Sequence, residues 1–234
     1  MGAQVDGEIV MNGDEDDEEE EDEAFSDHME SSDEESETET DYEGIDESKL
    51  NLDITAMIAY VSALTNGRSM FQFKEKILSE QAAWERSNPV KPELDKMFTG
   101  KELMCCQTAM KDFQTILATL GGEGERERGL QLIDRIKVVP DCHSAKTEGL
   151  QMSGKKVLIL TVSFSTLSIA GKIKDRSLFI FATGDNLRVL TVTANTGFVR
   201  AAAGQGVNFA VLTHQSRALT EDKEKSATLL PTKS

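Results

Sequence analysis

The sequence predicts an α/β domain built on a mainly parallel sheet. Two observations favour this class. Along residues 49–234, segments with apolar residues at helical spacing alternate with short apolar runs typical of buried strands. The intervening segments are also long enough for the crossover connections that parallel strands require. We therefore expect one sheet with helices on both faces, joined by right-handed crossovers.

Charge divides the chain into two parts. Residues 1–48 contain 23 of the 42 acidic residues and no Lys or Arg. A block of like charge this dense repels itself and has little apolar surface to bury, so we predict a disordered acidic segment. Residues 49–234 hold the other 19 acidic residues and all 25 basic residues, a net charge of +6. This part is long enough for one domain and can accept a polyanionic partner.

Cysteine usage and hydropathy restrict the location of the protein. Three cysteines (Cys105, Cys106 and Cys142) without metal-site spacing argue against a disulfide framework or a zinc site and favour a reducing compartment. The acidic N-terminus is unlike a secretory or mitochondrial signal. The most apolar run, residues 157–171, is too short to span a bilayer, and we interpret it as a buried strand or an insertion. We expect a cytoplasmic or nuclear protein without membrane association.

The remaining elements follow from periodicity and from turn residues. A first strand at residues 50–52 ends at Asp53, and a helix follows directly. Residues 187–192 fit a helix or a strand equally well. Elsewhere we expect helices at residues 74–86, 102–120, 123–134 and 198–203, and strands at residues 71–73, 135–139, 177–182 and 207–212.

Acidic residues stand where such a sheet would bind a ligand. In an open α/β sheet, ligands bind outside the carboxyl ends of the strands. Asp53 follows the first strand, and Asp185 follows the predicted strand at residues 177–182. Asp112 borders the apolar face of a helix and either lies at its surface edge or points into a site. The alternative for Asp53 is that its side chain only caps the following helix.

Carboxylates gathered at one edge repel each other unless a cation lies among them, and oxygen ligands suit Mg²⁺ or Mn²⁺. We predict Asp53, Asp112 and Asp185 as catalytic and metal-binding residues, with Asn195 as a further metal ligand. A cation held there can activate water against a phosphodiester. Arg188 and Arg200 are the predicted contacts to nucleic-acid phosphates.

Three motifs with this order of acids, LDIT, QTAMKDFQTIL and FATGD, resemble the PIN-like nuclease fold. Longer segments, among them NLDITAMIAYVSALTNG and TANTGFVRAA, resemble a eukaryotic family known as domain of unknown function 1308, which is grouped with PIN-like folds. The resemblance implies a PIN-like three-layer sandwich, which we place at residues 49–220. Residues 221–234 are largely polar, and we expect them to form a loose tail.

In this resemblance, Asp53 corresponds to the first PIN acid, Asp112 to the helical acid and Asp185 to a late strand-end acid. The remaining acid has no clear counterpart, Asp141 being the nearest. Asn195 stands where an acid is expected, and its neutral carbonyl would hold a cation more weakly.

The chain also differs from the family in its organisation. Members usually carry a further N-terminal domain before the acidic linker, and residues 1–12 resemble the end of that domain. Residues 156–172 interrupt the family pattern. They are either an insertion from retained non-coding sequence or an alternative transcript, or a strand particular to this lineage.

Two functions fit these observations. The first is a domain that binds nucleic acid, in particular RNA, without catalysis, while the acidic segment binds a basic protein or folds back onto the domain. The alternative is a Mg²⁺- or Mn²⁺-dependent ribonuclease. The missing acid and the neutral Asn195 favour the first.

Overall fold

A computed structural model describes residues 44–148, 150 and 169–231, with the backbone alone for residues 169–175. The predicted disorder of residues 1–48 therefore falls outside the described residues, apart from residues 44–48. The same holds for most of the segment at residues 156–172, of which only residues 169–172 are described, as part of a helix.

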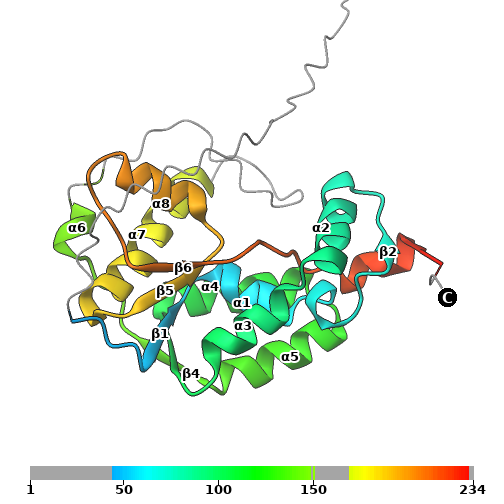
Figure 1. Cartoon of the computed structure of the whole chain (residues 1–234), viewed down its shortest axis with the longest axis horizontal. Helices are drawn as coiled ribbons and strands as arrows, with labels where there is room; N and C mark the ends of the chain where they lie inside the picture. The colour runs from blue at the N-terminus through cyan, green and yellow to red at the C-terminus, as the bar shows by residue number, and fades with distance from the viewer. Residues whose placement is uncertain (1–43, 149, 151–168, 232–234) are drawn as a thin grey trace, which may run out of the picture. The chain divides into compact units, whose positions relative to one another are not determined.

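The predicted parallel sheet is confirmed. Five strands, all parallel, lie in the order β4-β3-β1-β5-β6 (Figure 1). Their bounds are β1 (Lys49–Leu52), β3 (Glu102–Cys106), β4 (Ile136–Val139), β5 (Leu190–Thr193) and β6 (Val211–Thr213). A separate antiparallel pair joins β2 (Phe71–Gln72) to β7 (Thr228–Leu229).

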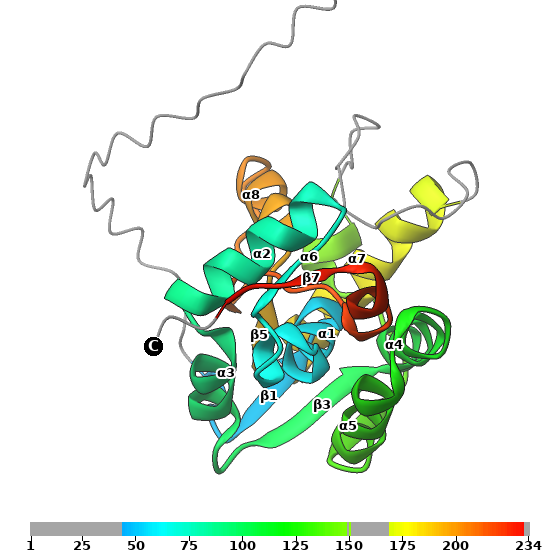
Figure 2. The same cartoon turned by 90° about the vertical axis from the view of Figure 1, so that its right-hand side faces the viewer.

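Helices cover both faces of the sheet. They are α1 (Ile54–Val61), α2 (Lys76–Ser87), α3 (Val90–Phe98), α4 (Gln107–Leu120), α5 (Glu123–Ile133), α6 (Ala145–Glu148), α7 (Ile169–Leu187) and α8 (Thr196–Ala203), with short 3-10 segments at η1 (Leu64–Asn66) and η2 (Glu221–Ser226). Helix α1 packs against α3, α4 and α5 on one side, and α7 packs against β1, β3 and β5 on the other (Figures 1 and 2).

The side chains of the central strand β1 contact helices on both faces of the sheet. Leu50 and Leu52 are buried in the main core, which they share with the apolar face of α1. Asn51 points the other way, because side chains alternate along a strand. Its Nδ2 donates to the carbonyl oxygen of Ile180 in α7, 2.9 Å away, and to Oγ1 of Thr191 in β5, 3.0 Å away. Asn51 therefore attaches α7 to the sheet.

Two sequence predictions about elements are wrong. Residues 177–182 belong to α7 and not to a strand, because a helix buried against a sheet can carry a continuous apolar run that periodicity does not distinguish from a strand. Residues 102–106 form β3, and the predicted helix begins only at Gln107. Helix α3 was not predicted at all; it begins directly after Pro89.

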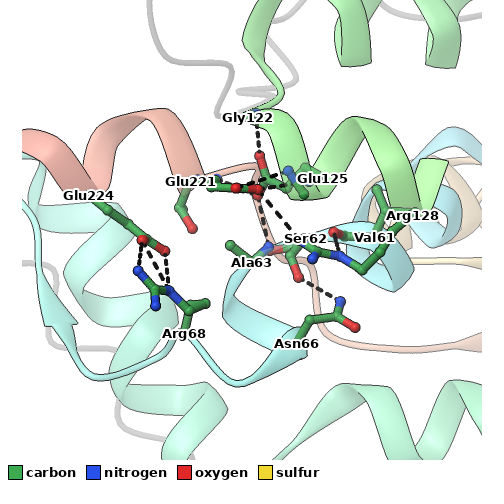
Figure 3. Close-up of polar contacts among 12 residues, drawn as sticks. Val61, Ser62, Ala63, Asn66, Arg68, Gly122, Glu125, Arg128, Glu221 and Glu224 are labelled. Atoms are coloured by element: carbon green, nitrogen blue, oxygen red, sulfur yellow. Dashed lines mark hydrogen bonds and ion pairs between the residues drawn. The ribbon is translucent and has the colours of Figure 1, made fainter. Parts of the chain in front are cut away.

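The predicted loose tail at residues 221–234 is also wrong for most of its length, since η2 and β7 are part of the fold. The fully buried carboxylate of Glu125 attaches this segment (Figure 3). It accepts backbone N–H groups from Ala63 at 2.8 Å, Thr220 at 2.9 Å, Gly122 at 3.1 Å and Glu221 at 3.4 Å. One side chain thus joins the end of α1, the start of α5 and the C-terminal segment.

The close approach of α7 to the sheet yields a test of this packing. A Cβ atom at Gly184 would lie 2.1 Å from Oγ1 of Thr191, so Gly184→Ala forces strands and helix apart. We expect the free energy of unfolding to fall by about 1–3 kcal/mol, the range for overpacked cores. Urea denaturation measures the change. Gly204→Ala is the matched control, because a Cβ there meets only ordinary contacts of 3.5 Å and longer; an equal loss in both variants would contradict the assignment.

Candidate functional site

The strand order places a change of direction at the centre of the sheet. From β1 the chain builds β3 and β4 on one side and then β5 and β6 on the other. In sheets of this kind, ligands bind in the crevice outside the carboxyl ends of the strands that flank such a switch point. Here these strands are β1 and β5, followed in the chain by Asp53 and by Ala194 and Asn195.

Asp53 is held firmly at this edge. Its side chain is 5% exposed, and Oδ2 accepts the hydroxyls of Thr193, at 2.6 Å, and Thr55, at 2.8 Å. Within the described part of the chain, Oδ1 receives no hydrogen bond. Asp53 occupies the N-cap position of α1, but its side chain makes no capping bond. The capping alternative is therefore wrong, and one oxygen of this carboxylate remains available.

Asn195 is also at this edge, in a structural role. Its Oδ1 accepts the backbone N–H of Phe198 at 3.1 Å, so Asn195 caps α8. Its Nδ2 lies 3.4 Å from Oγ of Ser177 in α7. The oxygen predicted to bind a cation is thus already an acceptor for the first turn of a helix.

His214 follows β6 and completes the edge. It is buried, and its backbone N–H donates to the carbonyl oxygen of Thr193. Nδ1 lies 2.9 Å from the carbonyl oxygen of Gln215, which requires Nδ1 to carry the proton in the neutral ring. Nε2 is then an acceptor, and it is buried without a hydrogen-bond partner among the described residues.

The charges around His214 act in opposite directions. Burial lowers the pKa of His214 and is the largest influence. The hydrogen bond to Gln215 and the negative charges of Asp53 and Glu93 act to raise it, and the charge of Arg217 lowers it. Burial prevails, so the imidazole is neutral at neutral pH and its Nε2 is unprotonated.

A cleft of about 640 Å³ opens beside His214. One wall is the junction of α2 and α3, from Ser87 to Val90, together with Glu93. The other wall is formed by Thr196 at the start of α8 and by residues 213–215. The size lies within the range of small-molecule sites, and both walls offer polar side chains.

A buried ion pair joins the two walls. Nε of Arg217 donates to Oε2 of Glu85 at 2.7 Å, and neither side chain is more than 5% exposed. Glu85 also accepts the backbone N–H of Val90, and Nη2 of Arg217 donates to the carbonyl oxygen of Asn88. The pair therefore fixes the distance between the α2–α3 junction and the segment after β6.

The structure places Asp112 near α7 and pairs it with a cation. Nη1 of Arg176 lies 3.0 Å from Oδ2 of Asp112. Arg176 precedes Ser177, whose hydroxyl neighbours Asn195. Asp112 thus lies in the neighbourhood of the carboxyl edge, but its charge is compensated by a guanidinium.

Asp185 and Arg188 are not brought to this edge. Asp185 lies near the end of α7, about 12 Å along the helix axis from Ser177 at 1.5 Å per residue. It pairs with Nζ of Lys146 at 2.9 Å. The backbone carbonyl of Arg188 accepts the N–H of Asp46, which precedes β1. Both residues are therefore near the amino ends of the strands.

Asp141 has a capping role. Its Oδ1 accepts the backbone N–H of Thr108 at 2.9 Å and Oδ2 accepts the Thr108 hydroxyl at 2.6 Å, at the start of α4. Burial acts to raise the pKa of Asp141, but the hydrogen bonds from Thr108 and Cys106 outweigh it, so the pKa is lowered. This carboxylate is ionised and already bound.

The predicted donor set does not fit a shared cation. Asp53 offers one oxygen, Asp112 is paired with Arg176, Asp185 is remote and Asn195 caps α8. Over the described ranges, no group of three or more His, Cys, Asp or Glu side chains is placed to hold a metal ion.

A family model described as "Protein of unknown function (DUF1308)" matches residues 50–228. The chain belongs to the DUF1308 family. The match covers the sheet from the second residue of β1 onward and the whole of the cleft. No solved structure matches the chain. In the part of this DUF1308 protein that the structure describes, no helix is long and apolar enough to cross a membrane.

Sequence reasoning missed His214, Glu93, Arg176 and Arg217. His214 is the most informative omission, and a signal for it was present: it lies two residues after the predicted strand at residues 207–212. The other three lie in helices or in a loop, and only the tertiary structure brings them to the carboxyl edge.

The lowered pKa of His214 predicts how stability depends on pH. The unfolded histidine, with a pKa near 6.5, binds a proton at a higher pH than the folded one. The stabilisation is therefore complete above this value and is lost as the pH falls through it towards the folded pKa. Melting temperatures measured from neutral to mildly acidic pH should fall less steeply in His214→Asn than in the wild type. The exposed His143, as His143→Asn, is the control; a wild-type slope in both variants would contradict the prediction.

The ion pair between the walls predicts a large asymmetry between single and double variants. Arg217→Met leaves Glu85 buried without its partner and should lower the free energy of unfolding by about 3–5 kcal/mol. Arg217→Met combined with Glu85→Leu should recover much of that loss. Lys76→Met, which removes an exposed ion pair, should change stability by less than about 1 kcal/mol. Chemical denaturation tests all three, and a harmless Arg217→Met would refute the role of the pair.

Proposed function

We propose that residues 49–220 form a PIN-like domain that binds RNA at the carboxyl edge of its sheet without hydrolysing it. The PIN-like assignment is supported by the order of the five parallel strands and by the acid directly after the first of them. Neither feature depends on a catalytic activity.

The observation that carries the proposal is the ion pair of Asp112 with Arg176. A carboxylate that is compensated by a guanidinium 3.0 Å away contributes little to holding a cation. The same pair places a partly exposed arginine near the carboxyl edge, where a phosphate can compete with Asp112 for it. The edge is therefore better suited to bind a phosphate than to concentrate negative charge.

A second arginine is available on the helix that begins at this edge. Arg200 is exposed and lies about 7 Å along α8 from the capping Asn195. The net charge of +6 on residues 49–234 adds a favourable long-range term for a polyanion. Contacts of this kind go to phosphates and carry no base preference, so we expect binding with little sequence specificity.

The second function is the Mg²⁺- or Mn²⁺-dependent ribonuclease. The observation that favours it is Asp53, whose Oδ1 receives no hydrogen bond from a described residue and whose negative charge acts on the neutral ring of His214. A carboxylate and a neutral imidazole at one edge of the sheet are groups that can take part in proton transfer.

One experiment separates the two functions. We expect the full chain to bind fluorescently labelled single-stranded RNA in EDTA, as measured by anisotropy, and to leave it intact when Mn²⁺ is added. Arg200→Gln should weaken binding and reduce the salt dependence by about one charge. Arg188→Gln is the matched control, because Arg188 lies near the opposite edge and should leave the affinity unchanged. Mn²⁺-dependent cleavage that is abolished by Asp53→Asn would reject the binding function and establish the ribonuclease.

A further inference from the structure

A second hollow lies on the side of the sheet covered by α1, α3 and α5. Its volume is about 290 Å³. It is lined by Tyr60 of α1, Lys91 of α3, Arg128 of α5 and Arg135, which follows the end of α5, and no acidic side chain is among the described residues that do so. Three cations, two of them in helices and one in the segment after α5, thus converge on one small space.

Tyr60 organises two of these cations. Nζ of Lys91 lies 3.5 Å from the centre of the tyrosine ring, and Nη1 of Arg135 donates to the tyrosine hydroxyl at 3.1 Å. The attraction of the ring for cations stabilises this arrangement. Lys91 and Arg135 nevertheless repel each other across the ring, and an anion between them would remove that repulsion.

The acidic residues near these cations hold them only loosely. Lys91 is 3.6 Å from Asp95, and Arg128 is 3.7 Å from Glu221. Both distances exceed the length of a hydrogen bond, whereas the pair of Arg217 and Glu85 in the same protein measures 2.7 Å.

Two of the guanidinium groups have unused capacity. Nε of Arg128 donates to the carbonyl oxygen of Val61 at 2.9 Å (Figure 3), which fixes the side chain. Its Nη2, however, is buried without a hydrogen-bond partner among the described residues. For Arg135, the same residues offer no acidic partner. Both guanidinium groups therefore retain hydrogen-bonding capacity, although Glu221 lies 3.7 Å from Nη2 of Arg128.

We propose that this hollow is a phosphate-binding site. Guanidinium groups present paired N–H donors that match the oxygens of a phosphoryl group, and three positive charges suit a dianion better than a single carboxylate. The volume is at the lower limit of small-molecule sites, so the hollow takes the phosphoryl group and little of what is attached to it.

The site is separate from the cleft beside His214. Tyr60 lies about 10 Å further along α1 than Asp53, at the other end of the helix. No residue lines both spaces. The proposal therefore does not rest on the proposed RNA binding, and either can fail alone.

Two sources of phosphate fit the same chemistry. One is free inorganic phosphate or a small phosphomonoester. The other is a phosphoserine in the acidic segment of this chain, where Ser32 and Ser36 each directly precede an acidic residue, the context favoured by acid-directed kinases. In both cases the bound group is a tetrahedral dianion.

The test is a thermal melting titration of the full chain with sodium phosphate, against sodium chloride of equal ionic strength. We expect saturable stabilisation by phosphate alone. Lys91→Gln and Arg135→Gln should each weaken the apparent affinity by about tenfold, equivalent to about 1.4 kcal/mol. Lys96→Gln is the matched control, because it removes the same charge from an exposed position on α3. Melting without phosphate verifies that each variant is folded.

Two outcomes would overturn the proposal. One is a melting temperature that rises no more with phosphate than with chloride. The other is a phosphate effect that is equal in Arg135→Gln, Lys96→Gln and the wild type, since the cations of the hollow would then be irrelevant.

A second arm identifies the source. The full chain is phosphorylated with an acid-directed kinase and the titration is repeated. If a phosphoserine of the acidic segment fills the hollow, added phosphate no longer stabilises the phosphorylated chain, and Arg135→Gln lowers its melting temperature. An unchanged titration assigns the hollow to free phosphate or a phosphomonoester.

Discussion

The buried carboxylate of Glu125 is the interaction on which the arrangement of this protein depends most. Desolvation raises the pKa of this group, and the backbone N–H groups it accepts act in the opposite direction. Those donors come from three separate parts of the chain: the end of α1, the start of α5 and residues 220–221. Without Glu125, the N–H groups of Ala63, Gly122 and Thr220 would be buried and unsatisfied, which is costly for each of them. The C-terminal segment is attached there, and the position of the cleft wall follows from that attachment.

The two edges of the sheet have different chemistry as a consequence. At the carboxyl edge, Asp53 and His214 are buried, and His214 lines a cleft. Their polar atoms are oriented by threonine hydroxyls and a backbone carbonyl. At the amino edge, Asp185 forms an ion pair with Lys146. The surroundings of an acidic side chain in this fold therefore depend on which edge of the sheet it lies at.

This distinction also explains what the sequence could predict. The first strand, Asp53 and α1 are adjacent in the chain, so a local pattern was sufficient to place them, and the structure confirms the position. Residues 177–182 are equally apolar, but the choice between strand and helix depends on Asn51 and Thr191, with which α7 packs and which lie far away in the sequence. Because residues 177–182 were predicted as a strand, Asp185 was expected at the carboxyl edge, whereas it lies near the amino edge. The pair of Arg217 with Glu85 joins residues 132 positions apart, a contact that no local pattern contains.

The segment after β6 has one more consequence. It passes from His214 and Gln215 in the cleft wall, through the buried Arg217, to the amides held by Glu125 and then to the pairing of β7 with β2. These contacts follow one another along a few residues, so the wall cannot shift independently of its anchor. A molecule entering the cleft would alter the hydrogen-exchange protection of the amides at residues 220 and 221, some distance from where it binds. Hydrogen exchange at residues 220 and 221, beside the end of α1, would thus report whether the cleft is occupied.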